Sequence, residues 1–116
     1  MMGNVRVCKT TVTTDGSGNA SKASDYIHGE ILKISYDKGT VAAGTTCVTT
    51  ITSTGEQVDS KDVNAAAKAV TYPCAARSGA SAGDNKWTNF ICSGTLTFTV
   101  SSGSVSKTFD VYVHYR

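Results

Sequence analysis

Cys74 directly follows Pro73, the only proline of the chain, in the stretch TYPCAAR (71–77), where a reactive thiol in a tight turn is one reading. A thiol nucleophile needs a neighbouring base and a third group that orients this base. His28 and His114 are the two histidines, and no spacing pattern links either one to Cys74. We therefore favour a structural joint, in which Pro73 ends a strand and Cys74 packs as a small buried residue.

Other residues that bind metals or phosphates are present without the spacing that such sites use. The cysteines form no Cys-x-x-Cys pair, so we expect them to be mostly reduced and to bind no zinc; they are Cys8, Cys47, Cys74 and Cys92. The stretch DGSGN (15–19) lacks the closing glutamate of an EF-hand, which favours a solvated turn. No glycine-rich phosphate loop is found, and the acidic residues are scattered. We expect no enzymatic activity, cofactor or metal.

The composition fits a single β-rich domain over residues 1–116. Only 17% of the residues are charged, and Thr, Ser, Gly and Ala are abundant, as in pleated sheets and tight turns. The net charge is +2 without a Lys/Arg cluster, so we expect no nucleic-acid partner. No stretch approaches the roughly 20 apolar residues of a membrane span. The N-terminus has no apolar signal region, so we expect folding in the cytoplasm where the chain is made.

The clearest elements lie near the C-terminus. The stretch TLTFTV (95–100) alternates apolar and polar residues, and VSKTFDVYVHYR (105–116) does the same after the turn SSGS. Period-two alternation in two runs around a glycine turn predicts a β-hairpin with one buried and one solvated face. Its buried residues would be Leu96, Phe98, Val100, Phe109, Val111, Val113 and Tyr115.

Strand patterns also cover residues 4–14, 26–37 and 45–53. In the second of these, apolar residues occupy both faces around Gly29, which predicts a central strand or a bulge. The segment 58–72 is ambiguous. Asp59 or Ser60 caps a short helical turn through Ala67, or the chain makes an irregular crossover; either is followed by a strand at 68–72.

These elements predict an all-β fold, an antiparallel β-sandwich or jelly-roll-like barrel of about seven short strands with long loops and at most one short helix. Residues 1–14 would form an N-terminal strand or arm. The polar loop 77–87 carries the only tryptophan, Trp87, and has Arg77 at its base and Tyr72 just before it. Because aromatic residues and arginine are frequent anchors of interfaces, these three are our candidate protein-interface residues.

The order of several short motifs from Gly29 onward resembles a family. The motifs are GEILKISY (29–36), TITSTGE (50–56), VNA (63–65), the Tyr72–Pro73 pair with the later Arg77, and a Lys-Thr-Phe return strand (107–109). In this order they resemble the small structural proteins of tailed bacteriophages that are encoded close to the major capsid protein. In that family an arginine closely follows the Tyr-Pro pair, whereas here Cys-Ala-Ala intervenes.

The resemblance implies a capsid decoration, or cement, protein. Such a protein binds the major capsid protein on the outer surface of the virion as a homotrimer and stabilises the shell. Two other functions remain open. One is a tail or connector component of the same virion. The other is a carbohydrate-binding β-sandwich module that uses Trp87, Tyr72 and Tyr112 as stacking platforms.

Overall fold

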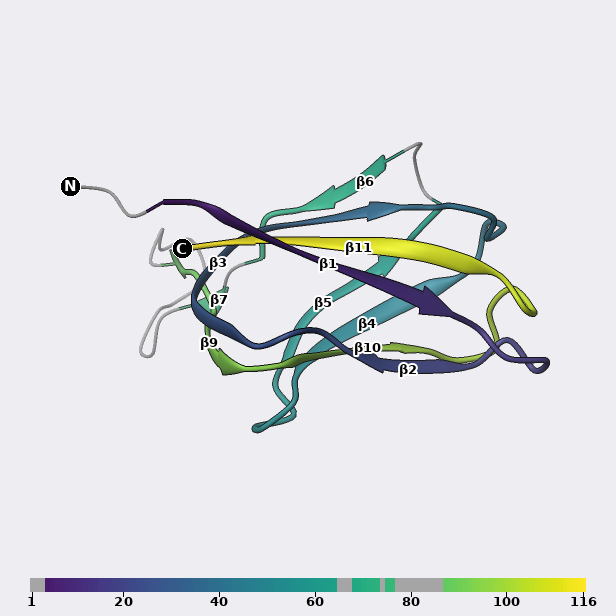
Figure 1. Ribbon diagram of the computed structural model, residues 1–116, viewed down its shortest axis with the longest axis horizontal. Coiled ribbons are helices and arrows are strands. Elements are labelled where there is room, and N and C mark those ends of the chain that lie inside the picture. Colours follow the sequence, from purple (N-terminus) through teal and green to yellow (C-terminus); the bar gives the residue numbers. More distant parts are fainter. Residues whose placement is uncertain (1–3, 65–67, 74, 77–86) are drawn as a thin grey trace.

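A computed structural model of the chain describes residues 4–64, 68–73, 75–76 and 87–116. These residues form two antiparallel sheets that face each other (Figure 1), and they contain no helix. The five-stranded sheet has the order β1 (Arg6–Thr13), β11 (Thr108–Tyr115), β3 (Ile27–Asp37) and β6 (Lys68–Thr71), and β9 (Ile91–Gly94) also pairs with β3. The four-stranded sheet has the order β2 (Ala20–Ala23), β10 (Leu96–Val100), β4 (Thr46–Ile51) and β5 (Gln57–Asp62). The predicted all-β sandwich is confirmed, with more strands than the seven expected.

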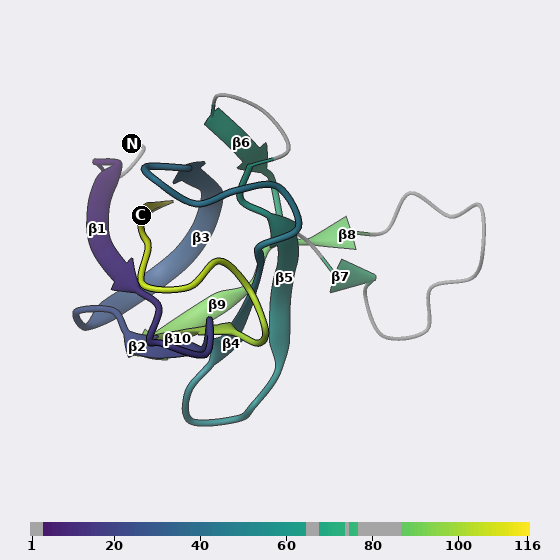
Figure 2. The same cartoon turned by 90° about the vertical axis from the view of Figure 1, so that its right-hand side faces the viewer.

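A separate two-stranded ribbon lies outside the two sheets (Figure 2). It consists of β7 (Ala75–Ala76) and β8 (Trp87–Thr88), paired antiparallel. The ribbon leads into and out of the segment 77–86, which is part of the predicted polar loop and lies outside the described residues. The described ribbon thus lies beside the sandwich.

The core lies between the sheets and follows the alternation that the sequence shows. Every second residue of β10 and of β11 is buried. The predicted core residues Leu96, Phe98, Val100, Phe109, Val111 and Val113 are all at most 1% exposed, whereas Tyr115 is only half-buried at the rim. Cys8, Cys47 and Cys92 are free and buried, as expected for small apolar residues. Cys74 lies outside the described residues.

The predicted C-terminal hairpin is wrong, because β10 and β11 lie in different sheets. β10 pairs with β2 and β4, and β11 pairs with β1 and β3. The connection 101–107 is longer than the loops of about two to five residues that close hairpins. It contains two non-glycine residues with positive φ, Ser102 and Ser106. The same alternation therefore gives two strands that bury their apolar faces against each other across the core.

A bulge in β3 explains why its apolar residues occupy both faces of the sequence pattern. His114 of β11 lies opposite Lys33, but the next residue, Tyr115, lies opposite Ile31, so Leu32 is the extra residue. The bulge changes the phase of alternation, and Ile31 and Ile34 both become fully buried. β3 is also central, because it pairs with β11, β6 and β9. The prediction of a central strand or a bulge is confirmed on both counts.

The alternative of a short helix capped by Asp59 or Ser60 is wrong. Both residues belong to β5, which pairs with β4. Asp59 is 9% exposed, and its carboxylate accepts a hydrogen bond from the Tyr36 hydroxyl. Alanine's helix preference is a weak effect, and the pairing with β4 together with this buried bond outweighs it. The predicted strand at 68–72 is confirmed as β6.

Candidate interaction surface

Of the three candidate interface residues, the structure describes Tyr72 in full and Trp87 by its backbone only. Tyr72 follows β6 directly, and it is 71% exposed. Arg77 lies outside the described residues, and so does the side chain of Trp87, whose backbone belongs to β8 opposite Ala76. Tyr72 is therefore the one candidate whose side chain the structure describes, and this side chain is exposed to solvent.

Other exposed apolar residues join Tyr72 on one half of the molecule. Large hydrophobic residues are exposed at seven positions among the described residues: Val5, Val7, Tyr26, Val70, Tyr72, Ile91 and Val105. We call Val5, Val7, Tyr26, Tyr72 and Ile91 the termini end, because they surround the start of β1 and the end of β11. Val105 lies at the opposite end, in the connection between β10 and β11.

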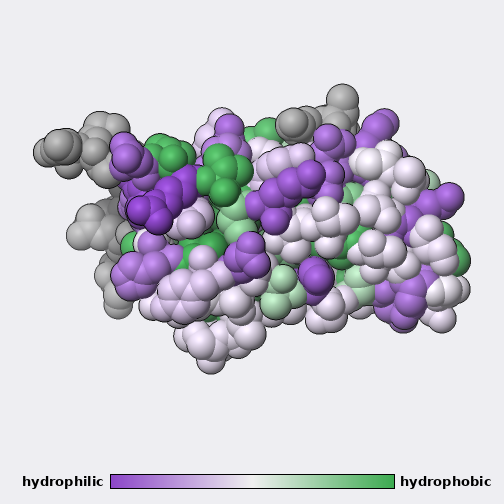
Figure 3. Space-filling model, in the orientation of Figure 1, coloured by the Kyte–Doolittle hydropathy of each residue, from purple (hydrophilic) through white to green (hydrophobic). Residues whose placement is uncertain are grey.

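The strand register places Val7 and Ile91 in the same sheet, with β11 and β3 between them. Val7 lies opposite His114 on β11, and His114 lies opposite Lys33 on β3. On the other half of β3, Glu30 lies opposite Ile91. Figure 1 shows the start of β1, the end of β11 and β9 at this end, and Figure 3 shows hydrophobic surface there. The end thus combines segments that are far apart in the sequence.

A small polar cluster lies beside Ile91 on the ladder between β3 and β9. The Ser93 hydroxyl is 3.1 Å from the Tyr26 hydroxyl and 3.2 Å from Nδ1 of His28. The Tyr26 and His28 rings are stacked, with centroids 6.5 Å apart and planes 9° from parallel. His28 therefore has a serine partner that the sequence spacing does not reveal. The cluster is exposed, and within the described part of the chain no carboxylate is hydrogen-bonded to the imidazole.

An ion pair joins β3 to the C-terminal residue at the termini end. The Arg116 guanidinium lies 3.3 Å from the Glu30 carboxylate, and the two backbones exchange two hydrogen bonds. Two residues before Arg116, Nδ1 of His114 is buried without a hydrogen-bond partner among the described residues. Burial lowers the pKa of His114, and the neighbouring Lys33 lowers it further. The imidazole is therefore held neutral beside Val7, which adds to the apolar character of this end.

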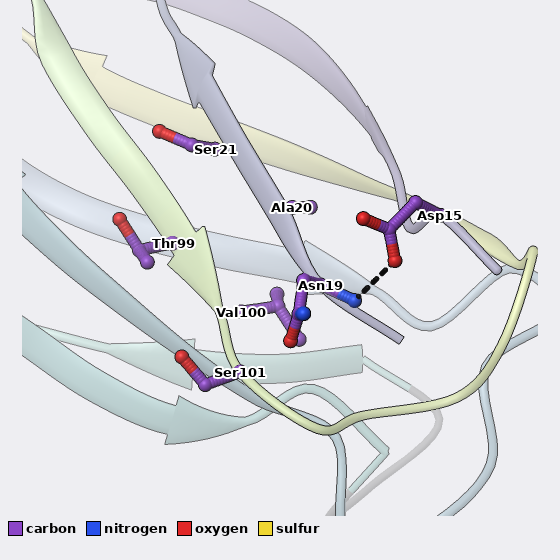
Figure 4. A pocket seen from close by; sticks show the side chains of 7 residues that line it. All are labelled: Asp15, Asn19, Ala20, Ser21, Thr99, Val100 and Ser101. Carbon is purple, nitrogen blue, oxygen red and sulfur yellow. Dashed lines mark hydrogen bonds between the residues drawn. The ribbon is translucent and has the colours of Figure 1, made fainter. Parts of the chain in front are cut away.

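The groove shown in Figure 4 lies at the opposite end of the sandwich and has a volume of about 430 Å³. It lies between the 15–19 turn and the end of β10. The Asp15 carboxylate accepts hydrogen bonds from the backbone N–H groups of Ser17 and Asn19, which lower its pKa. The Asn19 side-chain oxygen accepts a bond from the Ser102 N–H. The groove's charged and amide groups thus hold the turn together, as expected for a solvated turn.

The buried ionisable groups form a structural cluster. The Tyr36 hydroxyl lies 2.6 Å from the Asp59 carboxylate and 3.3 Å from the Thr49 hydroxyl. Burial raises the pKa of Tyr36, and it raises the pKa of the adjacent Cys47 thiol to about 12. A thiol in this state is not a nucleophile. The described residues contain no group of three or more His, Cys, Asp or Glu side chains that could hold a metal ion.

Sequence reasoning missed most of the termini end, although a signal for it exists. Val7 alternates in phase with Lys9, Thr11 and Thr13, which are all exposed. Ile91 alternates out of phase with the buried Cys92. An apolar residue on the polar face of a strand is the informative exception, because it marks exposed apolar surface.

Comparisons with protein-family models, curated proteins and solved structures found no match for this chain. Among the described residues, no helix is long and apolar enough to cross a membrane.

Proposed function

We propose that this protein is a phage capsid decoration protein that binds the outer surface of the shell through the termini end. The observation that supports this most directly is the gathering of exposed Val5, Val7, Tyr26, Tyr72 and Ile91 at one end of the sandwich. The motif order from Gly29 onward, with its likeness to small virion proteins, selects the class of partner.

Several exposed apolar side chains at one end of a domain are typical of protein interfaces, which combine apolar anchors with polar groups. Ile91 is 65% exposed and Tyr26 is 64% exposed, so both would lose much solvent contact in a complex. Polar groups lie among them: the Arg116–Glu30 pair lies between β1 and Ile91, and the Ser93 hydroxyl lies beside the Tyr26 hydroxyl. A few buried anchors of this type carry most of the binding energy in known interfaces.

The opposite end suits a surface that faces solvent. It consists of the 15–19 turn and the 101–107 connection, which are closed by backbone bonds such as Gly103 N–H to Gly18 O. Val105 is its exposed apolar residue among those described. A sandwich with one apolar and one polar end can stand on a shell and leave the polar end outward.

The test is to mix purified protein with particles that lack it and to image the mixture. Copies arranged on the shell would support the proposal, and copies at its three-fold positions would also support the trimer that the resemblance implies. Density confined to the tail would favour the tail or connector alternative. Absence of particle binding would overturn the proposal, and binding to glycans instead would favour the carbohydrate module.

Matched variants locate the contact. Ile91→Ser should weaken particle binding by roughly tenfold or more, as expected for a buried apolar anchor. Val105→Ser removes a valine that is 51% exposed at the other end, and it should leave binding unchanged. Equal effects of the two variants would show that the termini end is not the docking surface.

A further inference from the structure

Strand β1 presents a long, regular edge. Within the described residues it pairs on one side with β11 over all of its eight residues, and no strand pairs with its other side. Figure 2 shows β1 at the outside of its sheet. An unpaired edge of this length is a template for another strand unless the protein blunts it.

The other sheet edges carry features that blunt them. β2 and β6 have four residues each, and the β5 edge carries an irregularity between Thr49 and Thr50 of its β4 partner. Short strands and bulges are two common ways to prevent edge pairing. β1 has neither feature, and it contains no proline.

A lysine on the edge is a third common protection, but Lys9 does not provide it. Its ammonium lies 4.0 Å from the Asp110 carboxylate and 5.9 Å from the centre of the Tyr112 ring. Both partners belong to β11, so the side chain is drawn across the sheet and away from the free edge. Lys9 therefore does not block the unpaired edge of β1.

The ladder shows which backbone groups are free at this edge. The Thr14 N–H donates to Lys107 O. In an antiparallel ladder every second residue bonds to the partner strand, so Thr14, Val12, Thr10, Cys8 and Arg6 direct their backbone groups to β11. The intervening residues direct their N–H and C=O groups to the open side. These residues are Val7, Lys9, Thr11 and Thr13.

We propose that two copies of this chain associate by antiparallel pairing of their β1 strands, with Lys9 of each copy opposite Thr11 of the other. This register is the one that pairs all four open residues, Val7 with Thr13 and Lys9 with Thr11, in about eight backbone hydrogen bonds. It keeps the two Lys9 residues from lying directly opposite each other, as they would after a shift of one residue in each strand. Each Lys9 then lies beside Thr11 of the other copy, whose hydroxyl donates to Asp110.

The charges of β1 permit pairing with a second copy. Lys9 and Arg6 are the only charged residues of β1, and Asp110 of the same copy balances the charge of Lys9, so Lys9 needs no acidic residue from a partner strand. The pairing would join the two five-stranded sheets into one continuous sheet around a twofold axis. This contact goes beyond shell binding, and it is distinct from the threefold contact of the trimer that the resemblance implies.

The first test is sedimentation velocity of the full chain over a series of concentrations. We expect a dimer that becomes more populated with concentration. Lys9→Pro removes a backbone N–H that points to the unpaired edge, and it leaves the hydrogen bonds between β1 and β11 in place. It should raise the dimer dissociation constant by tenfold or more. Lys9→Ala removes the charge but keeps the N–H, and it should still form the dimer. Both variants should keep the circular dichroism spectrum of the natural chain.

A second test reads the register and does not depend on the proline variant folding. Lys9→Cys combined with Thr11→Cys, in a Cys74→Ala background, should form a disulfide from residue 9 of one copy to residue 11 of the other on mild oxidation. Either cysteine alone should not give this bond, which mass spectrometry can map. A monomer at all concentrations, a dimer or trimer unaffected by folded Lys9→Pro, or no 9-to-11 bond between copies would overturn the proposal.

Discussion

The Tyr36 hydroxyl donates a 2.6 Å hydrogen bond to Oδ2 of Asp59, and this bond links the two sheets through the core. Tyr36 is fully buried on β3 of the five-stranded sheet, and Asp59 lies on β5 of the four-stranded sheet. Thr49 of β4 is close to the same hydroxyl, at 3.3 Å. A buried carboxylate that keeps a hydrogen-bond partner avoids most of the cost of its desolvation.

Tyr36→Phe should destabilise the protein by about 2–3 kcal/mol, because it leaves the Asp59 carboxylate buried without its donor. Tyr26→Phe is the matched control, since it removes an exposed hydroxyl and should cost at most about 0.5 kcal/mol. Chemical denaturation measures both values. Adding Asp59→Leu to Tyr36→Phe should cost less than the sum of the single changes, and equal losses for the two tyrosine variants would contradict the role of this bond.

Phe109→Ala should cost about 3–5 kcal/mol, because the ring is 1% exposed in the core between the sheets. Val105→Ala changes a residue that is 51% exposed, and it should have little effect on unfolding. Thermal unfolding followed by circular dichroism gives both results, and the spectrum should be that of a β-protein. A mostly helical spectrum would contradict the fold.

The stability should fall as the pH drops below about 6.5, through His114. Burial, aided by Lys33, lowers the pKa of this imidazole from its ordinary 6.5, so the folded protein holds fewer protons than the unfolded chain. The contribution is complete above pH 6.5 and is lost as the pH falls towards the lower folded pKa. Comparing melting temperatures at pH 8 and pH 5.5 should show a smaller difference in His114→Gln. Asp15 adds to this fall only under more acidic conditions: backbone hydrogen bonds lower its pKa from the ordinary 3.8, so its stabilising contribution is present above that pH and is lost below it.

Cys47 should resist alkylation in the folded protein and react once the protein is unfolded. Its pKa of about 12, raised chiefly by burial, reduces the thiolate population at pH 8 by roughly a thousandfold relative to an ordinary thiol. Mass spectrometry after iodoacetamide treatment, with and without denaturant, checks this. Fast labelling of Cys47 in the folded state would revive a reactive-thiol role.

The sequence predicted which residues form strands and which of them face the core, but it did not predict how the strands pair. Phe98 and Phe109 were correctly placed on buried faces, because alternation depends only on neighbours along the chain. Pairing depends on the length and path of the connection between them, and residues 101–107 cross from one sheet to the other. Asp59 was misassigned for a similar reason, since its partner Tyr36 lies on a distant strand.

The exposure of Tyr72 was predictable, because its place before a polar loop indicated it. The placement of Val7 and Ile91 at the same end of one sheet depends on the pairing of β1 with β11, β11 with β3 and β3 with β9. The partner of His28 likewise depends on register, because Ser93 is opposite it on β9. Residues that meet across strands have no fixed separation along the sequence, so their contacts could not be predicted from sequence spacing.

The position of β11 between β1 and β3 sets a condition on when this protein can fold. Among the described residues, residues 6–13 have ladder partners only at residues 108–115, so their backbone groups can bond only to water until β11 has left the ribosome. Contacts that span most of the chain also slow folding, because the loop between them must close first. During synthesis, β1 therefore remains an unpaired strand. Neighbouring nascent chains on one messenger RNA would be most prone to aggregate by pairing through this strand.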